Sequence, residues 1–416
     1  MQGRIEEMDE EGLGVLTVDR KLHVPFTAPG DVVEVRGWRR KKHRLIATEY
    51  KVIEPSGLRT EPVCPYFGKC GGCTLQHLPY SEQIRFKSDK LSNLLDMMVD
   101  VSPSPRVYGH RNRIDIVIST RGIGFRRRGT WWDAVDIEGC PVFGPSSTRV
   151  LHSLREFIED HDPALYNIRQ NEGFLHYIVI REGKFTGELM INLITSEGPL
   201  PEAFPEYFDY ADSVYWSVNR TPSDVSYGEI RMFWGKEFIQ EKLDDTVYLI
   251  HPNSFFQTNS YQAVNLVKRV AELSEGDRVL DLYSGVGTFG IYLAKRGLHV
   301  EGIEMNPLAV EMARRNNELN GVEAAFRVGK DRDVKDLAGY DTVIVDPPRA
   351  GLHPKLIRRI LRDVPENIIY VSCNPKTLKQ NLDVLLEKYG IDYVAGLDMF
   401  PHTPHVEVVA KLKAKV

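Results

Sequence analysis

The stretch Asp277-Arg278-Val279-Leu280-Asp281-Leu282-Tyr283, followed by Ser284-Gly285-Val286-Gly287-Thr288-Phe289-Gly290, decides the fold of this chain. Its first half is an apolar run of strand length, and its second half is a glycine-rich turn that opens a helix running to Lys295. Further strands are expected from Leu298 to Ile303 and from Asp341 to Asp346. This alternation predicts an α/β fold with a Rossmann-like sheet over residues 251–416.

The glycine turn at residues 284–290 allows a ligand to approach the backbone closely. Glu304 ends the next strand, where its carboxylate can accept hydrogen bonds from ribose hydroxyls. The spacing Asp-x3-Gly-x-Gly, from Asp281 to Gly287, favours S-adenosylmethionine over a dinucleotide. A dinucleotide reductase is the alternative at this point.

A lone cysteine lies in Val371-Ser372-Cys373-Asn374-Pro375, between an expected strand at 366–370 and an expected helix at 376–388. Ligands of open α/β sheets bind outside the carboxyl ends of the strands. A free cysteine is also often a small buried core residue, so its position alone leaves both interpretations open. One strand earlier, Asp346-Pro347-Pro348-Arg349 resembles the Asp-Pro-Pro motif of amino-directed methyltransferases, with Arg349 in place of their base-stacking aromatic residue.

Size and composition indicate a globular protein of two or three domains, with 416 residues, 42% hydrophobic and 27% charged. No apolar run approaches the roughly 18 residues of a membrane helix. The N-terminus is too polar for a signal peptide, so a cytoplasmic protein without membrane contact is expected. The net charge of −5 does not indicate nucleic-acid binding, although a sum conceals local patches.

Residues 1–56 contain short alternating runs separated by glycine turns, which predict a small β-barrel. A basic cluster follows the last of these runs, with Trp38 inside it. Clustered cations beside an aromatic side chain suit single-stranded RNA, and a solvated charged surface is the alternative. The cluster consists of Arg36, Arg39, Arg40, Lys41, Lys42, His43 and Arg44.

Four of the five cysteines form one set, because Cys64, Cys70 and Cys73 are closely spaced and Cys140 lies in a Gly-Cys-Pro sequence. A disulfide framework is therefore not expected. Four thiolates can hold zinc or an iron–sulfur cluster, and the chemistry alone does not choose between them. The surrounding segment, residues 57–250, combines alternating strands with a helix at 147–160, which predicts an α+β domain carrying the cysteine site.

These motifs together resemble the RNA uracil-C5 methyltransferases, and the resemblance runs nearly end to end. It rests on Cys-x5-Cys-Gly-Gly-Cys, on Asn253 to Asn259, on Asp-Pro-Pro-Arg, on Ser-Cys-Asn-Pro, and on Met399 to Glu407. In detail the chain is most similar to the archaeal-type tRNA (uracil-54-C5)-methyltransferases. The resemblance implies a TRAM barrel over 1–56, a central iron–sulfur and RNA-binding domain over 57–250, and an S-adenosylmethionine-dependent domain over 251–416.

The resemblance also implies the site residues. Cys373 is the expected nucleophile, which mechanism also requires, and Glu407 is the expected base, with His402 and His405 as chemically able alternatives. The other assignments are cofactor contacts at Gln257, Tyr283, Thr288, Glu304 and Asp346, and a [4Fe-4S] cluster on Cys64, Cys70, Cys73 and Cys140.

The expected reaction is methylation of carbon 5 of an RNA uridine, and the favoured target is the T-loop uridine of tRNA. A uridine of 23S ribosomal RNA is the alternative target. A cytosine-C5 methyltransferase is disfavoured, because those enzymes pair Pro-Cys with a different acid. A non-catalytic RNA-binding protein is disfavoured by the intact motifs around Cys373 and Glu407. The chain is expected to act as a monomer.

Overall fold

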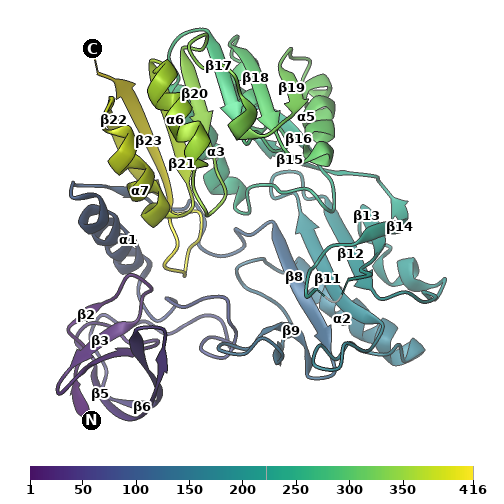
Figure 1. The fold of residues 1–416 in the computed structure, drawn as a ribbon. Helices are drawn as coiled ribbons and strands as arrows, with labels where there is room; N and C mark the ends of the chain where they lie inside the picture. Colours follow the sequence, from purple (N-terminus) through teal and green to yellow (C-terminus); the bar gives the residue numbers. More distant parts are fainter. Residues whose placement is uncertain (222, 416) are drawn as a thin grey trace.

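The computed structural model describes residues 1–221 and 223–415, and Figure 1 shows their arrangement: a curled N-terminal sheet, a central sheet and a C-terminal sheet layered with helices. Hydrophobic clusters lie inside each of these three parts. Across these two ranges, the structure contains no helix that is both long and apolar enough to cross a bilayer.

The N-terminal sheet has six strands in the order β1-β5-β6-β4-β3-β2. In β5, Val33 and Val35 are fully buried, and Val32 and Glu34 between and beside them are only partly so. Val33 and Val35 pack with Ile5, Leu16 and Leu22 inside the curled sheet, as the glycine-punctuated sequence predicts. The strands are β1 (Gln2–Arg4), β2 (Glu7–Met8), β3 (Gly14–Thr17), β4 (Lys21–Val24), β5 (Val32–Lys41) and β6 (Arg44–Glu54).

The central sheet has seven strands in the order β10-β9-β8-β11-β12-β13-β14, and its core includes residues of the helices α2 and η1. A separate hairpin, β15 with β16, follows it. The elements are β8 (Arg113–Ser119), β9 (Gly122–Arg126), β10 (Ala134–Asp136), α2 (Ser146–His161), β11 (Leu175–Glu182), β12 (Leu189–Thr195), η1 (Phe204–Phe208), β13 (Ser213–Val218), β14 (Glu229–Gly235), β15 (Ile239–Leu243) and β16 (Thr246–Ile250).

The C-terminal sheet has eight strands in the order β19-β18-β17-β20-β21-β23-β22-β7, parallel from β19 to β21. β23 runs antiparallel to both of its neighbours. Its elements are α3 (Ser260–Leu273), β17 (Arg278–Leu282), α4 (Thr288–Ala294), β18 (His299–Glu304), α5 (Pro307–Leu319), β19 (Ala325–Val328), η2 (Asp331–Asp333), β20 (Thr342–Val345), α6 (Pro354–Asp363), β21 (Asn367–Ser372), α7 (Pro375–Leu385), β22 (Tyr389–Leu397) and β23 (Glu407–Ala414).

Two hydrophobic cores cover the two faces of this sheet. Successive strand residues point to opposite faces, so Ile369 joins the core with α3, α4 and α5, while Tyr370 joins the core with α6 and α7. A sheet buried on both faces requires apolar strands, which is what the sequence of β17 shows. The expected α/β class is therefore present, with helices on both sides.

One strand of the C-terminal sheet comes from outside the range 251–416. β7 (Val101–Ser102) pairs with β22 at the sheet edge, and α1 (Tyr80–Leu95) contributes Leu91 and Leu95 to the adjoining core. In Figure 1, α1 lies between α7 and the N-terminal sheet. The domain boundaries near residues 56 and 250 stay predictions, and α1 and β7 pack on the sheet although they precede the second boundary.

Candidate active site

Cys373 lies half-buried in the turn between β21 and α7. Pro375 begins the helix, a position that suits its fixed φ. The Asn374 side chain caps the helix by accepting the Lys376 N–H at 3.3 Å, and its amide donates to the Arg349 carbonyl at 2.9 Å. These contacts fix the cysteine at the carboxyl end of a central strand.

Glu407, the first residue of β23, lies beside Cys373. β21 and β23 pair with Ser372 opposite Val408, so extending this register by one residue brings Cys373 opposite Glu407. Cys373 itself lies in the bend after the last paired residue of β21, and the charge of Glu407 acts on its thiol. Glu407 is only 4% exposed. Two residues that are 34 positions apart in the sequence thus form one chemical unit.

Asp346 and Arg349 add two further charges to this unit. Asp346 follows β20, the neighbour of β21, and burial raises the pKa of its carboxyl to about 7. Burial and the charge of Asp346 raise the pKa of Glu407 well above its usual value, while Arg349 opposes this. Burial, Glu407 and Asp346 likewise raise the pKa of the Cys373 thiol, again against Arg349.

Glu304 and Tyr283 stand at the carboxyl ends of β18 and β17. The Glu304 carboxylate accepts the Gly285 N–H at 3.2 Å and the Asn306 N–H at 2.7 Å, which ties it to the glycine turn. Tyr283 adopts a φ of +64°, and its hydroxyl donates to Asp331 at 2.6 Å. A tyrosine in the left-handed region is uncommon, and such strain concentrates at binding sites.

Asp281 is buried behind these residues, and its Oδ2 accepts the Gly290 N–H at 3.0 Å. Its Oδ1 has no partner within residues 1–221 and 223–415. Burial, together with the charges of Asp346 and Glu304, raises the pKa of Asp281 to about 8. The carboxyl groups of Asp281, Glu304 and Asp346 thus lie at adjacent strand ends, and a positively charged ligand beside them would favour their ionised forms. S-adenosylmethionine, which carries a sulfonium and an ammonium group, is such a ligand.

Thr288 and Gln257 are both nearly buried, at 8% and 9% exposure. Thr288 begins α4, directly after the glycine turn. The Gln257 carbonyl accepts the Asn112 side chain at 2.7 Å, and Asn259 two residues later donates to the Met399 carbonyl at 3.2 Å. Gln257 therefore belongs to a segment that lies against the loop before Glu407. In the described parts of the chain, no side-chain hydrogen bond joins Gln257 or Thr288 to the strand-end residues.

Cys373 opens into a cavity of about 800 Å³ between the N-terminal sheet, α1 and the C-terminal sheet. Its walls include Glu10, from the turn between β2 and β3 of the N-terminal sheet, and Lys90, from α1. Arg349 and His405 also line it, and the same two residues line a second cavity of about 310 Å³. The two cavities thus share a wall.

The second cavity is lined by Cys64, Cys70, Cys73 and Cys140 together. Among residues 1–221 and 223–415, no three His, Cys, Asp or Glu side chains are grouped as ligands of a single metal ion. Zinc needs its ligands around one centre, at about 2.3 Å for sulfur, whereas the cysteines of a [4Fe-4S] cluster bind different irons. Burial and the other three cysteines raise the pKa of Cys73 to about 12, so four thiolates there require a positive centre.

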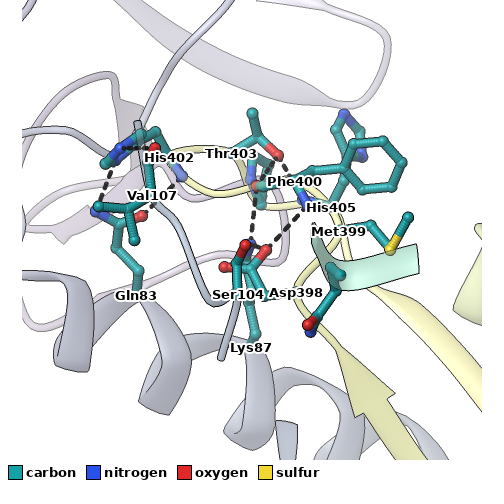
Figure 2. A network of polar contacts seen from close by, with 12 residues as sticks. Gln83, Lys87, Ser104, Val107, Asp398, Met399, Phe400, His402, Thr403 and His405 are labelled. Carbon is teal, nitrogen blue, oxygen red and sulfur yellow. Dashed lines mark hydrogen bonds and ion pairs between the residues drawn. The ribbon is translucent and has the colours of Figure 1, made fainter. Parts of the chain in front are cut away.

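The loop of residues 398–406 connects β22 to Glu407, and Figure 2 shows its polar contacts. His402 uses both ring nitrogens, one with the Gln83 amide at 3.2 Å and the other with the Val107 carbonyl at 3.0 Å. Burial lowers its pKa to about 4, so the ring is neutral and has no free nitrogen. His405, also with a pKa lowered to about 4, lines both cavities instead.

Comparison with known proteins identifies the group to which this arrangement belongs. The family tRNA (Uracil-5-)-methyltransferase matches residues 228–415, and the family tRNA (uracil(54)-C(5))-methyltransferase, TRAM domain, matches residues 1–58. The tRNA (uracil(54)-C(5))-methyltransferase of Pyrococcus horikoshii is 58% identical over 412 residues, which cover 99% of this chain and 100% of that protein. The chain belongs to the RNA uracil-C5 methyltransferase family.

Two further members of the family are similar to this chain over nearly its whole length. The 23S rRNA (uracil(747)-C(5))-methyltransferase of Pyrococcus horikoshii is 44% identical over 415 residues, covering 99% of both chains. The crystal structure of the Pyrococcus abyssi tRNA (uracil-54, C5)-methyltransferase, in complex with S-adenosyl-L-homocysteine, matches with a TM-score of 0.92 and 56% identity. It covers 99% of this chain and 100% of that one. The expected family and fold class are confirmed.

Fewer basic side chains of this methyltransferase are available for phosphate contact than the sequence suggests. Arg39 and Arg40 are exposed on the hairpin of β5 and β6, but Arg44 pairs with Asp9 at 3.2 Å and Glu10 at 3.0 Å. In the central sheet, several arginines are neutralised by carboxylates, namely Arg113 by Asp115, Arg126 by Asp224 and Arg127 by Asp133. The tip of the hairpin is therefore the stronger candidate for phosphate contact.

Sequence reasoning missed the residues of α1 that contact the 398–406 loop. Gln83 and Lys87 are buried polar residues of a helix whose local sequence looks like a solvated surface. Their partners lie more than 300 positions away, so no local pattern could indicate them.

Proposed function

We propose that this chain transfers a methyl group from S-adenosylmethionine to carbon 5 of uridine 54 in tRNA. The observation that carries the proposal is the end-to-end similarity to enzymes named for that position, joined to a cysteine opposite a buried carboxylate. Similarity to the 23S rRNA enzymes is lower, at 44% against 58% identity, so the ribosomal target is the second candidate.

Cys373 is the proposed nucleophile, because carbon 5 of uracil is a poor nucleophile by itself. The Cys373 thiol first gives its proton to water in the cavity that it lines. Sγ then bonds to carbon 6, and the electron pair of the carbon 5–carbon 6 double bond moves onto carbon 5 and the O4 oxygen as an enolate. S-adenosylmethionine, when bound, supplies an electrophilic methyl group for that carbon. A uridine inside a folded loop must be swung out to reach the thiol.

Glu407 is the proposed general base of the second half-reaction. Its carboxylate takes the proton from carbon 5, the electron pair re-forms the carbon 5–carbon 6 double bond, and Cys373 leaves as thiolate. Burial raises the pKa of Glu407, so that once this group is ionised its carboxylate is a stronger base than an exposed one. His405 is the remaining alternative, because the ring nitrogens of His402 are both engaged.

We assign the cofactor pocket to Gln257, Tyr283, Thr288, Glu304 and Asp346. Glu304 stands at a strand end, where it can accept hydrogen bonds from ribose hydroxyls. Asp346 lies between that pocket and Cys373, near enough to both for its charge to affect Asp281 and the thiol. Its position suits a contact with the cofactor on one side and with the base on the other.

We further propose that Cys64, Cys70, Cys73 and Cys140 hold a [4Fe-4S] cluster that stabilises the central domain, rather than a zinc ion. The cavity that the four cysteines line together supports this assignment. The absorbance spectrum of anaerobically purified protein tests it, since zinc gives no visible bands. The domain division at residues 56 and 250, action as a monomer and a cytoplasmic location stay predictions.

The test of the function is incubation with tritium-labelled cofactor and RNA transcripts, followed by nucleoside analysis. Label in 5-methyluridine from tRNA, lost when only uridine 54 is changed, is the expected result. Label in 5-methylcytidine, or label only in ribosomal RNA, would contradict the proposal. A Cys373→Ala variant that methylates at the normal rate would remove the assigned nucleophile.

A further inference from the structure

The 398–406 loop leads directly into Glu407, the first residue of β23, whose backbone pairs with Leu397 at the other end of the loop. The loop has no regular structure of its own, and His402 within it adopts a φ of +66°, an unfavourable value for a residue with a side chain. Contacts from elsewhere must therefore maintain its conformation. Figure 2 shows that many of them come from helix α1.

Gln83, Lys87 and Lys90 contact the loop from one face of α1, since positions i, i+4 and i+7 of a helix share a face. Gln83 accepts the His402 N–H at 2.9 Å and donates to the His402 ring. Lys90 donates to the Pro404 carbonyl at 2.8 Å. These contacts fix the path of the backbone between β22 and Glu407.

Lys87 makes the central contact, and it is fully buried with its partner. Its Nζ lies 2.5 Å from Asp398 Oδ1, both side chains are 0% exposed, and it also donates to the Phe400 carbonyl at 3.0 Å. The other oxygen of Asp398 accepts the Tyr80 hydroxyl at 2.9 Å. Burying an ion pair is a poor way to gain stability, because desolvation offsets the attraction, but it does select one geometry.

The docking of α1 does not depend on these polar residues. Leu91 and Leu95 insert into the apolar core beside α6 and α7, and β7 after the helix pairs with β22. Different side chains of α1 therefore pack the helix on the sheet and contact the loop. A variant can change the contacts with the loop while α1 stays packed on the sheet.

We infer that Gln83 and Lys87 are positioning residues for the general base: through His402 and Asp398 they fix the 398–406 loop so that the Glu407 carboxylate reaches the proton on carbon 5. This inference rests on the proposed function. It predicts a specific defect. When the loop is loosened, attack by Cys373 and methyl transfer proceed, but removal of the proton slows, and the methylated RNA stays covalently bound to the protein.

The test variant is Lys87→Met combined with Asp398→Asn, which removes the charge pair without leaving one buried charge alone. The amide that replaces the Asp398 carboxylate retains an oxygen for the Tyr80 hydroxyl or the Phe400 N–H. The matched control is Lys268→Met with Asp244→Asn, which removes a partly exposed lysine–aspartate pair of 2.9 Å between α3 and the turn of the β15–β16 hairpin, away from the 398–406 loop. Gln83→Leu is a second, uncharged variant that addresses His402 alone.

Three quantities are measured with tRNA containing [5-³H]uridine: single-turnover methyl transfer, tritium release, and the RNA–protein adduct that survives denaturing electrophoresis. We expect tritium release to fall about 10²-fold, the scale of an ångström of misplacement, with methyl transfer near the wild-type rate and a persistent methylated adduct. The control pair should behave as wild type. Thermal unfolding monitored by circular dichroism verifies that each variant is folded.

A double-mutant cycle separates positioning from general damage. In a Glu407→Gln background the base is already absent, so the Lys87–Asp398 substitutions should slow tritium release no further. The inference is overturned if adduct formation and adduct decay slow equally, if neither slows, or if the defects multiply in the cycle. If instead the wild-type protein releases no tritium and forms no 5-methyluridine, the proposed function fails, whatever the variants do.

Discussion

Replacing Glu407 by glutamine removes a base while leaving the shape of the side chain almost unchanged. The carboxylate is 4% exposed and lies opposite Cys373, so no water-exposed group can easily take its place. General bases contribute about 10²–10⁴-fold to a rate, which is roughly 3–5 kcal/mol of transition-state stabilisation. We therefore expect turnover of the Glu407→Gln variant to fall by that factor.

The reaction step at which the Glu407→Gln variant stops is as informative as its turnover rate. Methyl transfer precedes proton removal, so the Glu407→Gln protein should retain methylated RNA as a covalent adduct, detected as a shifted band that carries methyl label. Its thermal stability should be unchanged or higher, because burial makes an ionised carboxylate unfavourable there. Turnover within tenfold of wild type, or an adduct without methyl label, would refute the assignment. If His405→Asn trapped the adduct and Glu407→Gln did not, the base would be His405.

The remaining predictions concern stability, pH and salt. Lys87→Met alone leaves Asp398 buried without its partner and should lower the free energy of unfolding by about 3–5 kcal/mol in urea titrations, with most of it regained when Asp398→Asn is added. Alkylation of Cys373 by iodoacetamide, followed by mass spectrometry, should rise about tenfold per pH unit and level off above the ordinary thiol pKa, because burial and the nearby carboxylates raise it. Asp281 has a folded-state pKa of about 8 against about 3.9 when unfolded, so the folded protein binds the extra proton between these values. Its stability therefore falls as pH rises through this window, and Asp281→Asn should remove a dependence of several kcal/mol in pH-resolved unfolding curves. RNA affinity should fall steeply with salt in filter-binding assays, and Arg39→Ala should reduce the slope of log K against log salt by about one if this arginine contacts a phosphate.

Local patterns in the sequence were sufficient for several elements of the C-terminal sheet. The expected strand at 277–283 is β17, and the expected helix at 376–388 is α7, each within a few residues. Both follow from apolar runs and from caps such as Asn374 with Pro375. The turn at 285–290 also satisfies Gly-x-Gly-x-x-Gly, so its local pattern is shared with dinucleotide sites, and only the wider set of motifs separates the two.

The side chains that surround the site could not be predicted in the same way. The register that brings Glu407 opposite Cys373 is a property of two paired strands, and the family motif supplied it only by resemblance. Lys87 looks like a surface residue in its helix, and its burial depends on Asp398, 311 positions later. Contacts of this length leave no trace in local periodicity, which is why β7 also escaped prediction as a strand of this sheet.

The 398–406 loop explains why the parts of this chain preceding residue 251 bear on its chemistry. The carbonyl of His402 accepts the N–H groups of Thr74 and Leu75, at 2.8 and 2.9 Å, directly after the cysteine-rich segment. Its backbone N–H and ring are bound by Gln83 of α1. One residue of the loop is thus fixed from two sides by segments that precede the central sheet. The sheet sets the backbone register of Glu407 through its pairing with Leu397, and the cysteine segment and α1 hold the loop that leads into this residue.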